Sequence, residues 1–222
     1  MASVPKQIRD HGAIVVMNVP SPQALMPCAV SAWQGGLALQ ALPVSFPSVV
    51  EAGRSMLAQI AVTLGMADVV DVADVTAAVD AGAAFIVSPI VSPEVIGAAH
   101  ARGLVAIAGA FTPTEVAAGV KAGADFVALH PAGAFPDVTY FEHVARSFPT
   151  VPLLVSGGVD AGSAPGFLEA GAAAAVIDRG LFPERDAESN QQVVQTRALA
   201  LTEVCADAIG TPPASSVRPF GA

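Results

Sequence analysis

Charged residues are few in this chain, and most of them are acidic. Asp, Glu, Lys and Arg make up only 13% of the 222 residues, and the formal net charge is −9 at pH 7. A chain of this sign has no electrostatic attraction for the phosphate backbone of DNA or RNA. We therefore expect no nucleic-acid partner.

Cysteine is also scarce, and its spacing matches no common zinc or redox motif. Cys28 and Cys205 lie far apart with no Cys-x-x-Cys pattern, which suits a reducing cytosol. We expect both thiols to be inert core or helix residues. No two His, Cys or carboxylate residues stand at a recognisable metal spacing. We therefore predict a cytoplasmic protein that needs no metal and no other cofactor.

Long apolar runs are missing as well. Gly, Pro or Asp interrupts the longest apolar stretches before they reach the length of a membrane span. Residues 1–10 lack the apolar core of a signal peptide, so neither a membrane segment nor a secretory signal is expected. Hydrophobic residues still make up 53% of the chain, with a mean hydropathy of +0.60. This composition predicts a large core and a homo-oligomer that buries further apolar surface.

What the chain does contain is a repeated alternation of helical segments and short apolar segments. Thr112-Pro113-Thr114-Glu115 reads as a capping box with proline at the first helical position. The apolar run after this helix stops at His130-Pro131, as a buried strand would. The same unit recurs along the chain. The predicted strands are residues 13–19, 37–42, 60–64, 84–87, 104–108, 126–130, 151–155 and 173–177.

Eight apolar strands that alternate with helices are typical of a parallel sheet covered on both faces. At this length a closed barrel is favoured over the alternative, an open doubly wound sheet. We therefore predict a single-domain α/β protein, a (β/α)8 TIM barrel over residues 1–206. Residues 207–222 are predicted to form a tail, either a mobile end or an arm on a neighbouring subunit. In such a barrel the chemistry belongs at the carboxyl ends of the strands.

Several short motifs follow one another in an order that resembles a known enzyme family. They are Gly35-Gly36, Phe85-Ile86-Val87-Ser88-Pro89, Gly109-Ala110-Phe111-Thr112 with Glu115, residues 126–132, and Ser156-Gly157-Gly158-Val159. Over about residues 12–183 the chain resembles the 2-keto-3-deoxy-6-phosphogluconate (KDPG) and 4-hydroxy-2-oxoglutarate aldolases. The resemblance implies a trimeric (β/α)8 barrel that binds a small-molecule substrate, works through a Schiff base and needs no metal.

The catalytic residues of that family do not carry over. The position of its Schiff-base lysine is Ala128 here, and the only lysines of the chain are Lys6 and Lys121. Its acid/base glutamate falls on Ala41, or beside Gln40 if the register shifts by one residue. A Schiff base requires an amine, which alanine lacks. The resemblance therefore implies a degenerate member without the class I aldolase mechanism.

Only half of the family's phosphate site is recognisable. Ser156, Gly157 and Gly158 suit a strand-to-helix turn whose backbone N–H groups hold an anion. After the last strand, Asp178 would repel a phosphate, whereas Arg179 would bind a phosphate or carboxylate. The alternative is that Asp178 and Arg179 pair with each other or with loop charges.

His130 is the candidate catalytic residue. It lies two residues beyond Ala128, so strand alternation gives both side chains the same facing, toward the mouth of the barrel. An imidazole is a ready general acid or base near neutral pH. The alternative is that His130 only bonds a loop carbonyl. Further polar residues near the strand ends are candidates for substrate binding, with a purely structural role or, for Asp68, helix capping as the alternative. These residues are Asn18, Gln40, Thr63, Asp68 and Ser88.

Two functions from different classes remain open. The first is a repurposed aldolase-like lyase or isomerase that acts on a small anionic or carbonyl compound by acid/base catalysis without a Schiff base. The second is a catalytically silent relative that binds a small molecule or serves as an assembly subunit. Convergent polar groups around His130 would favour the first function, and an apolar or filled mouth the second.

Overall fold

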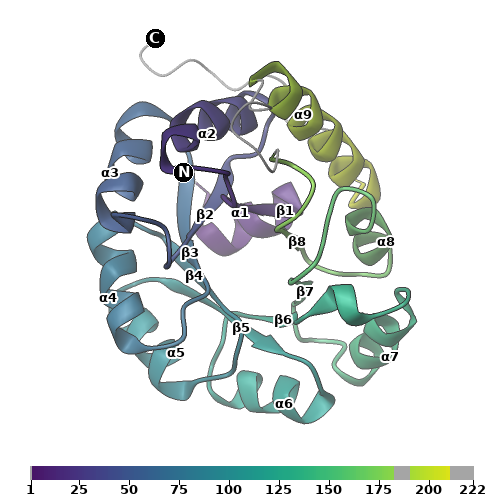
Figure 1. The fold of residues 1–222 in the computed structure, drawn as a ribbon. Coiled ribbons are helices and arrows are strands. Elements are labelled where there is room, and N and C mark those ends of the chain that lie inside the picture. Colours follow the sequence, from purple (N-terminus) through teal and green to yellow (C-terminus); the bar gives the residue numbers. More distant parts are fainter. Residues whose placement is uncertain (1, 183–190, 211–222) are drawn as a thin grey trace.

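The computed structural model describes residues 2–182 and 191–210, and in it eight parallel strands close into a barrel in sequence order (Figure 1). Each strand pairs with its neighbours in the chain, and β8 returns to pair with β1. The predicted (β/α)8 barrel is confirmed. The strands are β1 (Ala13–Val16), β2 (Leu39–Pro43), β3 (Thr63–Ala67), β4 (Phe85–Ser88), β5 (Val105–Ala110), β6 (Phe126–Leu129), β7 (Leu153–Val155) and β8 (Ala175–Ile177).

Helices surround the strands, all except α1 in a ring around the barrel (Figure 1). They are α1 (Val4–His11), α2 (Leu25–Gln34), α3 (Val49–Gln59), α4 (Val72–Ala81), α5 (Pro93–His100), α6 (Pro113–Lys121), α7 (Thr139–Ser147), α8 (Ala164–Glu169) and α9 (Gln191–Ala208). The capping box at Thr112 and Glu115 is present at the start of α6. Two short 3₁₀ helices, η1 (Pro22–Ala24) and η2 (Ala132–Ala134), complete the described elements. Because η1 occupies the first residues after Ser21, α2 begins only at Leu25, which leaves Pro27 in its first turn.

Helix α1, which the sequence reading missed, covers the amino ends of the strands (Figure 1). Ile8 is fully buried among the side chains that fill the barrel. Thr63, the first residue of β3, donates to the Gln7 side chain at 2.6 Å. The Arg9 guanidinium lies 5.0 Å from the ring centroid of Phe126, the first residue of β6. The amino end of the barrel is therefore occupied, and the carboxyl end is left for a ligand.

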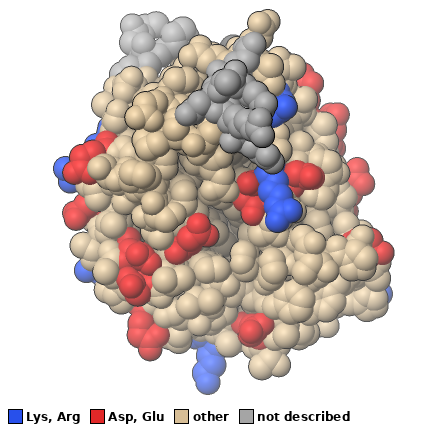
Figure 2. All heavy atoms as spheres, viewed as in Figure 1, with Lys and Arg blue, Asp and Glu red and all other residues tan. Residues whose placement is uncertain are grey.

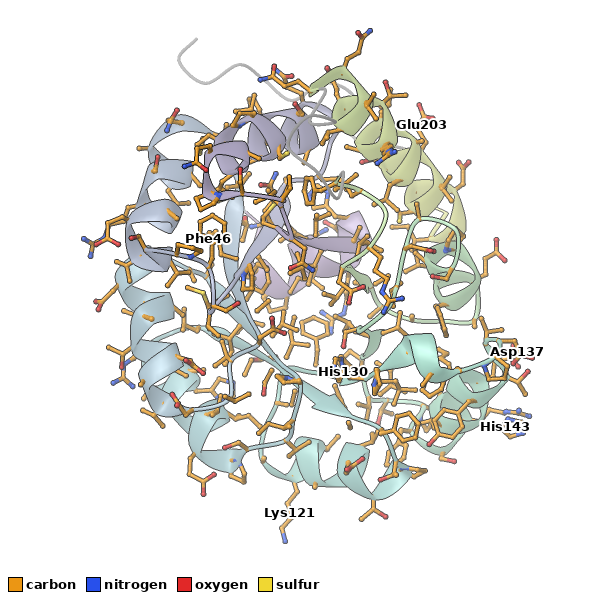
Figure 3. The ribbon with its side chains drawn as sticks, in the orientation of Figure 1. Phe46, Lys121, His130, Asp137, His143 and Glu203 are labelled. Atoms are coloured by element: carbon orange, nitrogen blue, oxygen red, sulfur yellow. The ribbon has the colours of Figure 1, made fainter. Side chains whose placement is uncertain are left out.

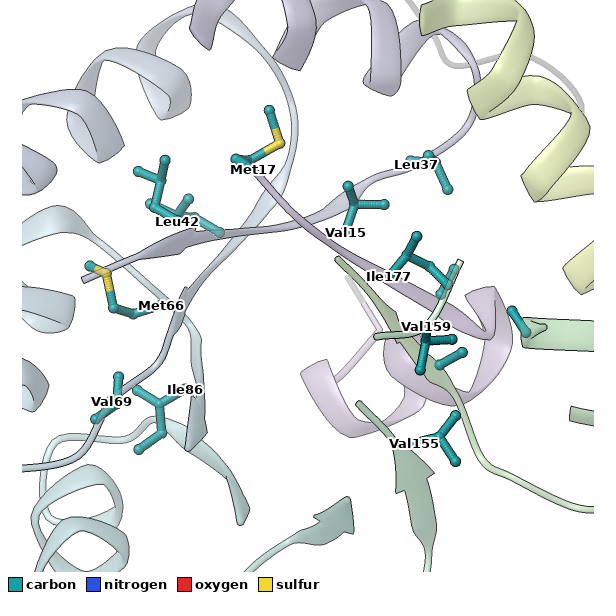
Figure 4. Close-up of a cluster of buried hydrophobic side chains, with 14 of the residues drawn as sticks. Val15, Met17, Leu37, Leu42, Met66, Val69, Ile86, Val155, Val159 and Ile177 are labelled. Atoms are coloured by element: carbon teal, nitrogen blue, oxygen red, sulfur yellow. The ribbon is translucent and has the colours of Figure 1, made fainter. Parts of the chain in front are cut away.

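Two groups of buried apolar side chains result from the alternation along each strand. One group fills the barrel and includes Ile14, Leu39, Phe85, Ala128 and Val176. The other lies between the strands and the helices and includes Val15, Met66, Ile86, Val155 and Ile177 (Figure 4). Residues next to each other in sequence thus face opposite sides, which decides which of them can reach the mouth.

Strand β3 lies three residues later than predicted at both ends. We expected residues 60–64 with Gly65 as the terminator, but Gly65 lies inside the strand. A Cβ atom at Gly65 would lie 2.2 Å from Cε2 of Phe85, so the barrel interior leaves no room for a side chain there. Gly65 is therefore a packing residue, and the mouth begins at Asp68.

In the ring of helices α9 lies along α2, next to the place where β8 pairs with β1 and the barrel closes (Figure 1). Thr202 Oγ1 donates to the carbonyl of Gly35 at 2.8 Å, across 167 residues of sequence. Of the predicted tail, residues 211–222 lie outside the described residues, and residues 207–208 belong to α9. None of the helices in the described ranges combines the length and hydropathy that a membrane crossing requires.

Candidate active site

A cavity of about 130 Å³ opens at the carboxyl ends of the strands. In Figure 2 it corresponds to a central hollow, with acidic side chains on its rim. Every strand end except those of β2 and β5 contributes to the wall. The lining residues are Val16, Asn18, Ala67, Asp68, Val87, Ser88, Pro89, His130, Ser156, Gly157, Val176 and Asp178.

His130 projects into this cavity from the end of β6 (Figure 3). Its Nδ1 lies 3.1 Å from Oγ of Ser156, and its backbone N–H donates to the carbonyl of Ala110 at 2.9 Å. Gly157 leaves space for the ring, because a Cβ there would lie 2.6 Å from Nδ1. The imidazole is thus held at Nδ1, and Nε2 remains for a ligand. Ala128, on the same side of the strand, is fully buried below it.

Asp68 follows β3 and lines the same cavity. Its φ of 61° is left-handed, which a non-glycine residue seldom adopts and which is often found at functional sites. The carboxyl keeps contact with solvent, but partial burial in the mouth raises its pKa. The charge of His130 lowers that pKa and the charge of Asp178 raises it. Asp68 therefore holds a proton more readily than a surface aspartate.

The turn after β7 has two consecutive glycines in the left-handed conformation, Gly157 with φ 78° and Gly158 with φ 82°. This geometry points backbone N–H groups toward one spot. The Gly158 N–H donates to both carboxylate oxygens of Asp178, at 2.8 and 3.0 Å. The Asp178 carboxylate therefore accepts hydrogen bonds from the turn after β7. Among the described residues it forms no ion pair with Arg179, which was one alternative from the sequence.

Asn18 and Ser88 reach the mouth as expected, although both already have protein partners. Asn18 Nδ2 donates to the backbone carbonyl of Asp178 at 3.1 Å. Ser88 Oγ donates to the carbonyl of Ile90 at 3.0 Å and accepts from the Ile90 N–H at 3.3 Å. Ser156 is 3% exposed and faces His130. These side chains form part of the cavity wall, and their hydrogen bonds hold the neighbouring backbone and the His130 ring in place.

Gln40 and Thr63 do not reach the cavity, which corrects two expectations from the sequence. Gln40 lies between Leu39 and Ala41, which both face the barrel interior, so its side chain faces α2. There its amide donates to the carbonyls of Ala29 and Leu37 at 3.0 and 3.1 Å. Thr63 begins β3 because that strand lies later than predicted, so it is at the amino end of the barrel.

Arg179 lines neither this cavity nor a second one beside it. The second cavity, of about 380 Å³, lies next to Gly158 and includes Phe135, Asp160 and Phe167 in its wall. The pKa of Asp160 is lowered, chiefly because the Ser163 N–H donates to its carboxylate, and the charge of Arg179 contributes in the same direction. The charge of Arg179 thus acts on Asp160.

Aromatic rings form a cluster near the rim, away from the first cavity. The ring centroids of Phe135 and Tyr140 lie 4.7 Å apart, and those of Phe111 and Phe135 lie 5.4 Å apart. Tyr140 Oη donates to the carbonyl of Phe111 at 2.7 Å. Phe182 is partly buried and packs against the core between strands and helices.

Neither lysine of the chain lies near the mouth. Lys6 is on α1, at the opposite end of the barrel, and bonds Asp10 at 2.6 Å. Lys121 ends α6 and points away from the molecule (Figure 3). Within residues 2–182 and 191–210, no group of three or more His, Cys, Asp or Glu side chains is arranged to hold a metal ion. The reactive groups at the mouth are thus an imidazole and two carboxylates.

Sequence reasoning discussed Asp178 but did not include it among the substrate-binding residues, although it lines the cavity. The available signal was its place directly after the last strand, since residues after parallel strands converge at one end of a barrel. It missed the second cavity as a whole. The residues of that cavity come from η2, the following loop and α8, which the strand pattern alone does not bring together.

Comparison with known proteins agrees with this geometry. A family model described as "KDPG and KHG aldolase" matches residues 4–196. The probable 2-dehydro-3-deoxy-6-phosphogalactonate aldolase of Rhizobium meliloti (strain 1021) is 41% identical over 69 residues, which span 31% of this chain and only 32% of that relative.

Solved structures of aldolases share the fold. The KDPG aldolase of Zymomonas mobilis ZM4, solved with 3-phosphoglycerate, has a TM-score of 0.80 at 20% identity and covers 90% of this chain and 95% of that one. The KDPG aldolase of Legionella pneumophila, with pyruvate captured as a covalent carbinolamine, has a TM-score of 0.73 at 18% identity and covers 93% and 98%. The match of the family model over most of the chain shows that this protein belongs to the KDPG and KHG aldolase family.

Proposed function

We propose that this protein is a repurposed aldolase-like lyase that cleaves or forms a carbon–carbon bond in a small hydroxylated carbonyl compound without a Schiff base. His130 and Asp68, which line one cavity at the mouth of the barrel, move the protons. The observation that carries this proposal is the convergence of polar groups on one cavity around His130, namely Asp68, Ser156 and Asp178. The reaction is written without an imine because Ala128 is buried below His130 and both lysines lie elsewhere.

The chemistry follows from what each side chain holds. In the tautomer whose Nδ1–H donates to Ser156, His130 Nε2 carries a lone pair and acts as a base. Asp68 has a raised pKa and acts as the acid. In the cleavage direction Nε2 takes the proton of the substrate hydroxyl, whose oxygen becomes an aldehyde carbonyl. The carbon–carbon bonding pair moves into an enol, and the former carbonyl oxygen of the substrate takes the proton of Asp68.

The enzyme is reset when the proton on His130 passes to Asp68 through solvent at the mouth. The enol then becomes the ketone by an ordinary tautomerisation. Each group therefore changes its protonation state once and regains it, and the substrate gains or loses no electrons overall. The ring of His130 is held for this task by Ser156 and by the space at Gly157.

The test is a retro-aldol screen with hydroxylated 2-oxo acids, with and without a terminal phosphate, run on untreated protein and on protein that was first treated with pyruvate and borohydride and then freed of both. We expect turnover that borohydride does not abolish, because no imine forms that it could reduce. Turnover that borohydride stops, together with an adduct on Lys6 or Lys121 in the mass spectrum, would contradict the proposal.

The second candidate function is a catalytically silent relative that binds a small molecule or acts as an assembly subunit. The specific observation in its favour is Ala128, which removes the amine that the family resemblance implies. A protein that binds compounds in the screen but turns over none of them would support this second function.

We also propose a homotrimer in the cytoplasm, with a small-molecule substrate as the partner of the site. The resemblance to trimeric aldolases supports the trimer, as do exposed apolar side chains near the strand ends, such as Val70, Ile90 and Phe111, which are 48%, 46% and 41% exposed. The buried positions of Cys28 and Cys205, and the lack of a Cys-x-x-Cys motif in the sequence, support the cytoplasm. Light scattering at micromolar concentration is the measurement for the trimer, and a monomeric mass would refute it.

A further inference from the structure

The turn after β7 has the backbone of an anion site. Barrels of this kind often bind phosphate at the loops after their seventh and eighth strands, and successive left-handed residues form a concave set of N–H donors. Gly157 and Gly158 have this conformation here. A phosphate at this turn would lie between the end of β7 and the end of β8, next to His130.

Three N–H donors of this region, those of Gly158, Gly162 and Ser163, donate to side chains of the protein. Both oxygens of Asp178 accept from the Gly158 N–H. The Gly162 and Ser163 N–H groups donate to Oδ1 of Asp160, at 3.0 and 2.9 Å. Two carboxylates thus take the bonds that an external anion would need.

The charge of the cavity has the same sign as these carboxylates. Asp68 and Asp178 both line it, and no lysine or arginine is among its described lining residues. The Arg179 guanidinium lies beside the turn, where its Cζ would be 3.7 Å from a Cβ on Gly158, but its charge also acts on the carboxylate of Asp160. Like charges within a few ångströms repel strongly in a partly desolvated site. A phosphate that displaced Asp178 from Gly158 would also leave that carboxylate without its backbone donor.

We propose that Asp178 is a built-in substitute for phosphate, and that the substrate presents hydroxyl groups, not a phosphate, to the Gly157–Gly158 turn. The claim about the substrate rests on the proposed function, whereas the claim about the turn does not. Each oxygen of Asp178 shares one N–H and keeps lone pairs on the cavity side. A hydroxyl group can donate to them, and a phosphate dianion cannot.

Asp178 is positioned for this by its backbone. Its N–H donates to the carbonyl of Val159 at 3.1 Å, and its own carbonyl accepts from Asn18 at 3.1 Å. The residue is thereby tied to the ends of β1 and β7. Asp178 acts in this proposal as a specificity-determining residue, separate from the proton transfer at His130.

The direct test is the binding of inorganic phosphate and methyl phosphate to the parent protein and to Asp178→Ala. Isothermal calorimetry gives the affinity, and the backbone amide resonance of Gly158 reports the location. We expect Asp178→Ala to bind both probes at least about tenfold more tightly than the parent, or about 1.4 kcal/mol. Asp178→Asn retains an acceptor for Gly158 without the charge, so a smaller gain is expected.

Asp80→Ala is the matched control, because it removes one carboxylate from the exposed outer face of α4. We expect it to bind phosphate no better than the parent. Circular dichroism melts establish that each variant is folded, and Asp178→Asn retains the size of the side chain if Asp178→Ala loses structure. Parent protein that binds phosphate at Gly158 as tightly as Asp178→Ala would overturn the proposal, as would two variants that bind no better than the parent.

Substrate class is tested by binding a hydroxylated 2-oxo acid and its terminal phosphate ester to the same proteins. The parent should prefer the unphosphorylated compound, and Asp178→Ala should lose at least about tenfold of that preference. A parent that prefers the phosphate ester would refute the inference. Because these are binding measurements, they stay informative even if the protein turns over nothing, which would count only against the proposed function.

Discussion

Nδ1 of His130 lies 3.1 Å from Oγ of Ser156, so the ring at the end of β6 is oriented by the residue that follows β7. The contact holds one nitrogen of the imidazole and leaves the other on the cavity side. A histidine with this arrangement can exchange a proton with a ligand without first losing its orientation.

His130→Ala should therefore reduce turnover by at least about tenfold to a hundredfold, at or just below the low end of what general acid/base catalysis contributes. The fold should be retained, because His130 is only half-buried at a strand end. The measurement is kcat across roughly pH 5 to 9, which brackets the titration of histidine. His143→Ala, on the exposed side of α7, is the control and should retain the parent rate and pH profile. An unchanged profile in His130→Ala would rule out the role.

The barrel and most of its helices could be predicted from the sequence, because apolar runs, caps and chain terminators are local signals. The capping box at residues 112–115 predicted the start of a helix, which is α6. The end of β3 was wrong, since Gly65 reads as a terminator unless its packing against the ring of Phe85 is known. Helix α1 was missed, although Ser3, Pro5 and the buried Ile8 are signals for it.

The mouth was predictable only in part. Because side chains alternate along a strand, the position of Ala128 correctly predicted that His130 faces the mouth of the barrel. Residues that directly follow a strand, such as Asp68, also line the cavity. Alternation applied to Gln40 would have excluded it, because Leu39 and Ala41 are typical interior residues. The bond from Gly158 to Asp178 joins two loops 20 residues apart. No local pattern encodes such a contact, which depends on how neighbouring strands place their ends.

Asp68→Asn should make the protein more stable at neutral pH. Burial raises the pKa of Asp68, so the folded state favours the protonated form. The raised pKa stabilises the fold below the ordinary pKa of aspartate, about 3.9, and this contribution is lost as the pH rises through the raised value. Asparagine remains neutral and tolerates the left-handed backbone.

The measurement is the melting temperature of parent and Asp68→Asn from pH 3 to 8. The difference should be absent at pH 3 and favour Asp68→Asn at pH 7, while turnover falls because the acid is lost. Asp80→Asn, on the outer face of α4, is the control for the change in net charge. A variant that melts below the parent at pH 7 would show that the charged carboxylate is stabilising.

Gly65→Ala should destabilise the barrel by about 1 to 3 kcal/mol, as added methyl groups do in a close-packed core. The new Cβ would lie 2.2 Å from Cε2 of Phe85, which is fully buried and has little space to move. Urea denaturation gives the free energy of unfolding. A second change, Phe85→Leu, should recover part of the loss if the ring is the cause. Equal losses in the single and double variants would place the strain elsewhere.

Ala128→Lys should give the protein the imine chemistry that the parent lacks. Position 128 faces the barrel interior directly below His130, so a long side chain from it would extend toward the mouth. Treatment with pyruvate and borohydride, followed by mass spectrometry, should show a reduced adduct on this variant and none on the parent. Ala118→Lys, which adds an amine on the exposed face of α6, is the control. An adduct on the parent would contradict the imine-free proposal.

The contact between α2 and α9 has a consequence for the synthesis of this protein. Thr202 on α9 donates a hydrogen bond to Gly35, 167 residues earlier in the chain, and β8 pairs with β1. A growing chain therefore carries the open edge of β1 and the apolar face of α2 until β8 and α9 have left the ribosome. Unpaired strand edges and uncovered apolar faces favour aggregation. The growing chain is therefore most exposed to aggregation before β8 and α9 have been made.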